Sequence, residues 1–186
     1  MVAIAGLAYY WMVRIPDPSE IHDAVVASDT GNQIERKDYD YTRAISYYDR
    51  ALELAGKEAS EKLIASIRLR RASARYYART GCEGVIEDFS YAIVRDGDAA
   101  AFAYALRGEC YVQTGKTQEA VADYGRVVQA NDRFWISQVL PKRAKLLEQQ
   151  GRKGAALADW KAYLAESPDN AEAKDAVARL SASATN

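Results

Sequence analysis

The chain has 186 residues, of which 49% are hydrophobic, and this is enough apolar material to bury the core of one domain. Its 25 lysines and arginines are balanced by 26 aspartates and glutamates. It therefore lacks the positive excess expected of a general binder of nucleic acid or of membrane surfaces.

The first element in chain order is an apolar run from Met1 to Val13, closed by Arg14. As a helix it would extend about 20 Å, short of the ~30 Å hydrocarbon core of a bilayer. Three interpretations stay open: the end of a membrane anchor whose start is missing, a helix packed on the fold, or an oligomer-forming segment or short signal. The cluster Tyr9-Tyr10-Trp11 favours the anchor, because such residues gather at membrane interfaces. We therefore favour membrane association through residues 1–15, with a soluble repeat domain, over a purely cytoplasmic protein.

A small or branched apolar residue followed four places later by a bulky aromatic recurs four times. The pairs are Ala44/Tyr48, Val85/Phe89, Ala120/Tyr124 and Ala156/Trp160, with their aromatics 41, 35 and 36 residues apart. Such i, i+4 spacing places both members of a pair on one helix face. A recurrence near 34 residues is typical of arrays of stacked helical hairpins.

A second pattern precedes each of the last three pairs: a small residue, a large residue three places later, and a glycine after four more. These triplets are Ala74/Tyr77/Gly81, Gly108/Tyr111/Gly115 and Ala144/Leu147/Gly151. The small and the large residue share a helix face. The glycine tolerates the left-handed conformation that ends helices, so each unit is predicted to be a helical hairpin.

The combined pattern resembles the tetratricopeptide repeat: small residue, aromatic, turn, alanine, aromatic, alanine, then proline. The closest matches are Ala44-Ile45…Tyr48…Ala51-Leu52, Gly108…Tyr111…Ala120…Tyr124 and Ala144…Gly151…Ala156…Trp160…Pro168. The resemblance covers roughly residues 25 to 168. It implies an all-α fold, a right-handed solenoid of stacked antiparallel helical hairpins.

Three repeats fit this pattern, and a fourth, N-terminal repeat fits only in its second helix, from about Tyr41 to Leu54. Its first helix would have to cross Asp29-Thr30-Gly31-Asn32, which is a poor helical stretch. After the last repeat, Asn170 to Leu180 is an amphipathic stretch whose polar face suits a terminal capping helix. We therefore expect three to four repeats plus a C-terminal capping helix.

The expected organisation has three parts. Residues 1–20 form an apolar N-terminal segment, residues 21–168 the repeat array, and residues 169–186 the capping helix and tail.

The sequence offers no catalytic constellation. His22 is the sole histidine and is interpreted as a surface or capping residue, and no phosphate loop, zinc spacing or nucleophile elbow occurs. For Cys82 and Cys110, two independent thiols are favoured over a disulfide, which would need an oxidising compartment. We expect no enzyme, no cofactor and no metal site.

A basic stripe is the better candidate for function. Arg68, Arg71, Arg75 and Arg79 follow one another at spacings of three, four and four, on one helix face. In the tetratricopeptide family the first helices line a concave groove, and the resemblance places the first three arginines there. The same match adds Phe102, Glu109, Val112, Gln138, Lys142 and Lys145.

Such a groove could hold an acidic or C-terminal peptide, because arginine pairs bidentately with carboxylates. The alternative is that the arginines are solvated or paired internally with Glu58, Glu61 or Glu109. The family's lysine–asparagine carboxylate clamp is not matched, since Arg71 and Arg75 occupy its positions without an asparagine. Near the third junction, Phe134 and Trp135 are expected to pack across the hairpins and not to form a docking patch.

The favoured function is a non-enzymatic adaptor that binds a segment of a partner protein, not nucleic acid, in the concave groove. The alternative is a structural subunit permanently embedded in a larger complex, one that could be membrane-associated. An adaptor should be a soluble monomer without the residues before about Pro16, whereas a subunit should aggregate. Substitution of Arg71 and Arg75 by glutamate should abolish partner capture and leave melting unchanged.

Overall fold

The computed structural model describes residues 15–56, 59–95 and 100–183. These residues form helices and contain no strand. The helices are η1 (Pro18–Glu20), α2 (Ala24–Asp38), α3 (Tyr41–Ala55), α4 (Glu61–Ala78), α5 (Cys82–Arg95), α6 (Ala101–Gln113), α7 (Thr117–Gln129), α8 (Arg133–Gln149), α9 (Lys153–Glu166) and α10 (Ala171–Ser183).

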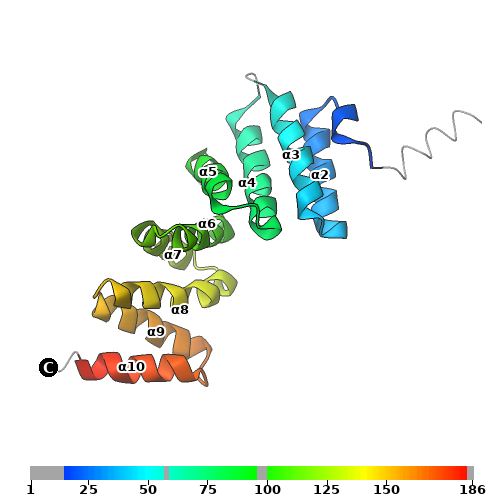
Figure 1. The fold of residues 1–186 in the computed structure, drawn as a ribbon. Helices are drawn as coiled ribbons and strands as arrows, with labels where there is room; N and C mark the ends of the chain where they lie inside the picture. The colour runs from blue at the N-terminus through cyan, green and yellow to red at the C-terminus, as the bar shows by residue number, and fades with distance from the viewer. Residues whose placement is uncertain (1–14, 57–58, 96–99, 184–186) are drawn as a thin grey trace, which may run out of the picture. The chain divides into compact units, whose positions relative to one another are not determined.

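The chain divides into two compact units, each with its own hydrophobic core. Unit 1 spans Met1–Gly97 and contains η1 and α2 to α5, and unit 2 spans Asp98–Asn186 and contains α6 to α10. Within each unit, helices that follow one another in the chain pack side by side (Figure 1). The predicted all-α architecture of stacked helical hairpins is confirmed.

The recurring aromatics are buried in the hairpins. Tyr48, Phe89 and Tyr124 are 0% exposed and Trp160 is 1% exposed. The residues four places earlier, Ala44, Val85, Ala120 and Ala156, are all fully buried. The sequence periodicity therefore identified the positions where the second helix of each hairpin meets the first.

The N-terminal hairpin is more regular than the sequence suggested. Helix α2 continues through Asp29-Thr30-Gly31-Asn32 without a break. The reason is packing: a β-carbon on Gly31 would lie 3.0 Å from Cε1 of Tyr48 and 3.2 Å from the carbonyl oxygen of Ala44. The close approach of α2 and α3 outweighs the low helix propensity of these residues. A fourth hairpin is therefore present.

The turns inside the hairpins confirm two of the three glycine predictions in detail. Gly115 follows α6 with φ 75° and Gly151 follows α8 with φ 73°. The next amide, Lys116, donates back to the carbonyl oxygen of Tyr111 at 2.8 Å, which closes the end of α6. Helix α4 ends earlier, because Arg79 itself takes the left-handed conformation with φ 56°, two residues before Gly81.

The segment before α2 lies along α3. The hydroxyl of Tyr47 donates to the carbonyl oxygen of Pro16 at 2.5 Å, and Nε of Arg50 donates to that of Ile21 at 3.1 Å. The apolar run from Met1 to Val13 lies outside the described residues. None of the described helices combines the length and the apolar character needed to cross a bilayer.

Helix α10 completes the core of unit 2. Ala173, Ala176 and Leu180 are buried against the rest of the unit, and α10 packs on α9. The side chain of Asn170 caps the helix by accepting a hydrogen bond from the amide of Ala173 at 2.9 Å. The predicted C-terminal capping helix is therefore present.

Candidate functional site

The predicted groove residues divide between the two units, and each unit is considered by itself. In unit 1, Arg71 of α4 reaches into the hairpin and binds Asp88 of α5 through two bonds of 2.7 Å, from Nε and Nη2. Its Nη1 donates to Asp49 of α3 at 2.6 Å. Because Asp88 is 0% exposed, this carboxylate depends on arginine for compensation of its charge.

The two neighbouring arginines take part in the same cluster. Arg75 donates to Asp88 at 2.9 Å. Arg68 lies 3.3 Å from Glu87 and 3.5 Å from Asp88, and its guanidinium stacks on Tyr91 at 4.3 Å. Internal pairing, the alternative that the sequence left open, therefore occurs at all three arginines.

The acidic partners differ from those considered in the sequence. Glu61 lies 3.8 Å from Arg95, Glu109 pairs with Lys142, and Glu58 lies outside the described residues.

The same arrangement recurs in unit 2. Arg107 of α6 binds Asp123 of α7 through two bonds of 2.7 Å, and Arg143 of α8 binds Asp159 of α9 in the same bidentate way. In every case the aspartate directly precedes the core aromatic, at Phe89, Tyr124 or Trp160. Sequence reasoning missed these arginine–aspartate pairs, although an aspartate before each aromatic was a usable signal.

Burial shapes the ionisation of the Arg107–Asp123 pair. Burial raises the pKa of Asp123, and the hydrogen bonds and charge of Arg107 offset only part of that rise. Burial also opposes the charge of Arg107, but the hydrogen bonds and charge of Asp123 outweigh it and raise its pKa. The pair is a structural link between the two helices of a hairpin, because its charged atoms already satisfy one another.

The six predicted groove residues of unit 2 lie on two neighbouring first helices. Phe102, Glu109 and Val112 are on α6, and Gln138, Lys142 and Lys145 are on α8. We call the surface formed by α6, α8 and α10 the first-helix face of unit 2. Val112 is 38% exposed on it, Lys142 pairs with Glu109, and Lys145 binds Glu172 of α10 at 2.8 Å.

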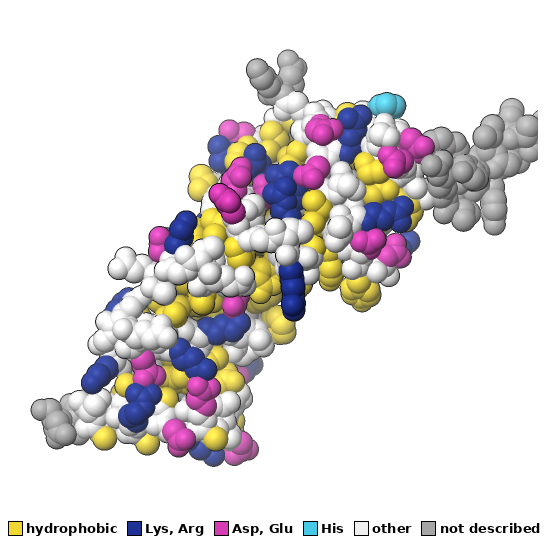
Figure 2. Space-filling view, in the orientation of Figure 1, with side chains coloured by type: hydrophobic (Ala, Val, Ile, Leu, Met, Phe, Trp, Pro, Cys, Tyr) yellow, Lys and Arg dark blue, Asp and Glu magenta, His cyan; other side chains and the backbone are white. Residues whose placement is uncertain are grey.

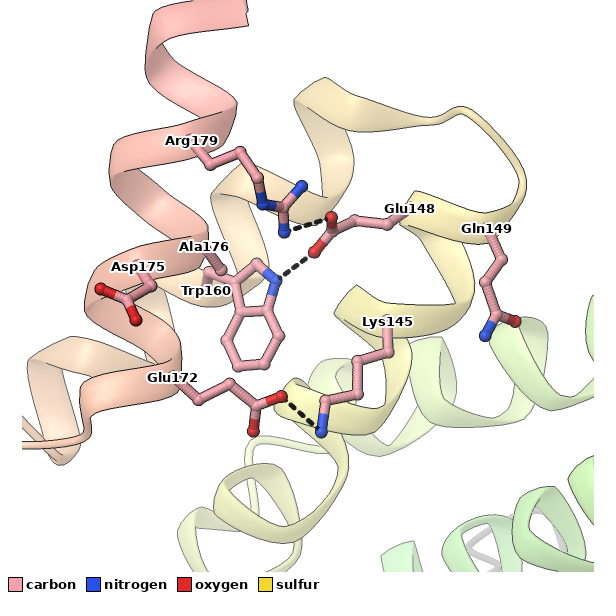
Figure 3. Close-up of a pocket in the computed structure, with 8 residues that line it drawn as sticks. All are labelled: Lys145, Glu148, Gln149, Trp160, Glu172, Asp175, Ala176 and Arg179. Carbon is pink, nitrogen blue, oxygen red and sulfur yellow. Dashed lines mark hydrogen bonds and ion pairs between the residues drawn. The ribbon is translucent and has the colours of Figure 1, made fainter.

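A hollow of about 580 Å³ opens between α8 and α10 on this face (Figure 3). The lining residues are Lys145, Glu148, Gln149, Trp160, Glu172, Asp175, Ala176 and Arg179. Two ion pairs bridge the helices, Lys145–Glu172 at 2.8 Å and Arg179–Glu148 at 2.7 Å, with Trp160 between them (Figure 3). Of these residues only Lys145 was predicted, since the charged face of α10 was interpreted as solvated.

Two partners hold the side chain of Glu148 in the hollow. Its carboxylate accepts the indole N–H of Trp160 at 2.8 Å and lies 2.7 Å from Nη2 of Arg179. Burial acts to raise the pKa of Glu148, but these two hydrogen bonds and the charge of Arg179 outweigh it and lower the pKa. Glu148 therefore stays ionised at neutral pH and fixes the indole at the base of the hollow.

The aromatic junction at the start of α8 is partly exposed. Trp135 packs on the core of unit 2, 6.5 Å from the ring of Phe102, as predicted for packing across the junction. Phe134 lies edge-on to Trp135 but is 64% exposed. Among the described residues, no group of His, Cys, Asp and Glu could hold a metal ion.

Comparison with known proteins supports the repeat interpretation. Residues 103–133, which include most of α6 and all of α7, match the family model of the tetratricopeptide repeat. Residues 103–133 therefore form a tetratricopeptide repeat. The matched region contains Arg107, Asp123 and Tyr124, so it covers one complete arginine–aspartate pair of the repeat array.

The fold is also similar to a solved structure, described as the crystal structure of MamA protein. The two share 18% sequence identity at a TM-score of 0.65, over 84% of this chain and 80% of that chain. No curated protein matches the chain. The structural likeness supports the same tetratricopeptide-type fold.

Proposed function

We propose that this chain is a non-enzymatic adaptor that holds a segment of a partner protein on the first-helix face of unit 2. Tetratricopeptide repeats generally serve protein–protein interaction, and the hollow between α8 and α10 is the observation that supports this place. It is bordered by exposed polar side chains and has a buried indole at its base, a combination suited to binding a side chain of a partner.

The arginines of unit 1 contribute less to this proposal than the sequence suggested. Arg71 and Arg75 are already paired with Asp49 and with the fully buried Asp88, so a ligand carboxylate would have to compete with both. On the face drawn in Figure 2, acidic and basic side chains are interspersed over unit 2. We therefore do not include an acidic partner in the proposal.

The experiment uses the full chain and a displayed library of random peptides. Selected peptides should lose at least tenfold in affinity when Gln149, at the border of the hollow, is replaced by tryptophan. Gln129→Trp, on the exposed side of α7, is the matched control and should bind as the wild type does. Failure to select any peptide, or equal binding by both variants, would contradict the proposal.

A second measurement addresses the alternative, a subunit permanently embedded in a larger complex. Sedimentation of residues 16–186 should show a monomer if the protein is an adaptor. Aggregation of this fragment with retained helical content would favour the embedded subunit. The predicted membrane association through residues 1–15 is tested in parallel, by flotation of the full chain and of the fragment with lipid vesicles.

A further inference from the structure

The charge of the hollow between α8 and α10 suggests the chemistry of what enters it, and this inference rests on the function proposed above. Three lining residues are acidic, Glu148, Glu172 and Asp175, whereas two are basic, Lys145 and Arg179. Both basic residues are engaged, Lys145 with Glu172 and Arg179 with Glu148. The hollow therefore carries an excess of one negative charge.

Asp175 is the source of that excess. It forms no ion pair or hydrogen bond with any residue that the structure describes, while the adjacent Lys174 lies 3.5 Å from Asp169. Glu172 stands one helical turn before Asp175 on α10, and such i, i+3 neighbours lie on the same side of a helix. In Figure 3 Glu172 lies beside Lys145, whereas the carboxylate of Asp175, another lining residue, points away from Trp160.

The ion pair at one end of the hollow, Lys145–Glu172, is weak enough for a ligand cation to replace Lys145. The side chains of Lys145 and Glu172 are 50% and 59% exposed, and such solvent-exposed pairs contribute at most about 1 kcal/mol. An incoming cation can therefore take the place of Lys145 at Glu172 at little cost. At the other end, the carboxylate of Glu148 is only 19% exposed and is held by Trp160 and Arg179, so it stays in place.

We propose that the hollow accepts a basic side chain, arginine or lysine, from the partner segment. Its charged end pairs with Glu172, and Asp175, one turn further along α10, adds negative charge nearby without contacting it. Its methylene stem lies along Ala176 and Trp160, because long basic side chains bury their stems on apolar surface while the charge stays near water. An acidic side chain is disfavoured, since the lining residues carry an excess of one negative charge.

The test compares carboxylate-removing variants of the full chain against peptides selected from the random library. Glu172→Gln and Asp175→Asn, separately and together, remove negative charge from an exposed face of α10 and should leave helical content unchanged. Glu166→Gln is the matched control, because Glu166 is also exposed and ion-paired, with Arg133, but lies outside the hollow.

We expect the selected peptides to share a basic residue. The double variant should weaken their binding at least tenfold, and so should glutamine in place of that basic residue, while Glu166→Gln has no effect. Binding should also weaken as salt is raised. Peptides without a shared basic residue that are still blocked by Gln149→Trp would overturn this inference and leave the adaptor function standing. Failure to select any peptide would overturn both.

Discussion

At the scale of single residues, the core aromatics of the first and last repeats share a polar anchor. The hydroxyl of Tyr48 donates to Glu35 at 2.9 Å, and the indole of Trp160 donates to Glu148 at 2.8 Å. Both glutamates stand four residues after the small residue of their repeat, Gly31 or Ala144. Burial and the neighbouring Glu35 raise the pKa of Tyr48, so its phenol stays protonated and serves as a donor.

The small residue of the repeat is predicted to be sensitive to one added carbon. In Gly108→Ala the new β-carbon would lie 2.6 Å from Cε1 of the buried ring of Tyr124. We expect overpacking of about 1–3 kcal/mol to exceed the gain of about 1 kcal/mol in helix propensity. Thermal melting should therefore occur at a lower temperature.

Gly125→Ala in α7 is the control for this substitution. Its new β-carbon meets only Nη1 of Arg143, at an ordinary 3.5 Å, so it should stabilise the fold by up to about 1 kcal/mol. A Gly108→Ala protein that melts at or above the wild-type temperature would contradict the close approach of α6 and α7.

The arginine–aspartate pairs should contribute to stability as coupled partners. Asp123→Ala leaves Arg107, whose side chain is 13% exposed, without its buried carboxylate. We expect a loss of about 3–5 kcal/mol in urea unfolding. The double variant Arg107→Met/Asp123→Leu should recover most of it, because neither charge is then buried. Asp169→Ala, at an ion-paired aspartate whose side chain is fully exposed, is the control and should unfold as the wild type does.

These pairs also change one expectation drawn from the sequence. Glutamate at positions 71 and 75 was expected to leave melting unchanged. Because Asp88 is fully buried between those arginines, charge reversal would place carboxylates against a carboxylate, and the protein should lose stability. Loss of partner capture by that variant would therefore not identify a binding surface.

The carboxylate of Glu148 should make stability depend on acid pH. Its pKa is lowered in the folded protein from the ordinary 4.5, so it binds a proton less readily folded than unfolded. Its contribution is thus fully present above about pH 5 and is lost as pH falls below 4.5 through the folded pKa. Melting of the wild type and of Glu148→Gln should differ most at neutral pH and converge in acid. A constant difference would contradict this assignment.

At the scale of elements, the sequence periodicity predicted the repeating helices. It did not predict features that depend on contacts between helices. The pairs from Ala44/Tyr48 to Ala156/Trp160 placed the second helix of all four hairpins. Helix α2 was harder, because Gly31 and Asn32 are poor helix formers and only packing against Tyr48 explains them. The small residue Gly31 and the large Ile34 three places later did repeat the family pattern, and Ile34 is buried.

Amide hydrogen exchange tests the continuity of α2. Residues Thr30 to Glu35 should exchange slowly, at rates similar to those of the adjacent helix α3, because their amides lie inside a packed helix. Exchange as fast as that of an unfolded peptide would show that the stretch from Asp29 to Asn32 interrupts the helix. In that case the array would begin at α3.

At the scale of the whole molecule, the candidate site was less predictable than the fold. The family resemblance supplied Lys145 at the hollow, but Glu148, Glu172 and Arg179 required coordinates. Their meeting depends on how α10 lies against α9, and helical spacing within one segment carries no information on such contacts. The charge of Arg68, Arg71 and Arg75 was visible in the sequence, whereas their pairing with the buried Asp88 required coordinates.

Because each unit has its own core, a substitution in the core of one unit should destabilise that unit and not the other. Leu180→Ala removes a side chain that is 3% exposed in the core of unit 2 and should cost about 2–5 kcal/mol. In hydrogen exchange measured by mass spectrometry, α8 to α10 should become less protected while α2 and α3 keep their wild-type rates. Equal loss of protection in both units would show that the array unfolds as one cooperative block.

The bond between Trp160 and Glu148 has a practical consequence. An indole at the base of the hollow, tied to a carboxylate that also holds Arg179, is a natural fluorophore whose emission reports the local electric field. A bound side chain that displaces Arg179 or covers Ala176 alters that field. The intrinsic fluorescence of Trp160 can therefore report binding without an attached dye. With Trp11 and Trp135 replaced by phenylalanine, a shift in the emission maximum of Trp160 would report binding.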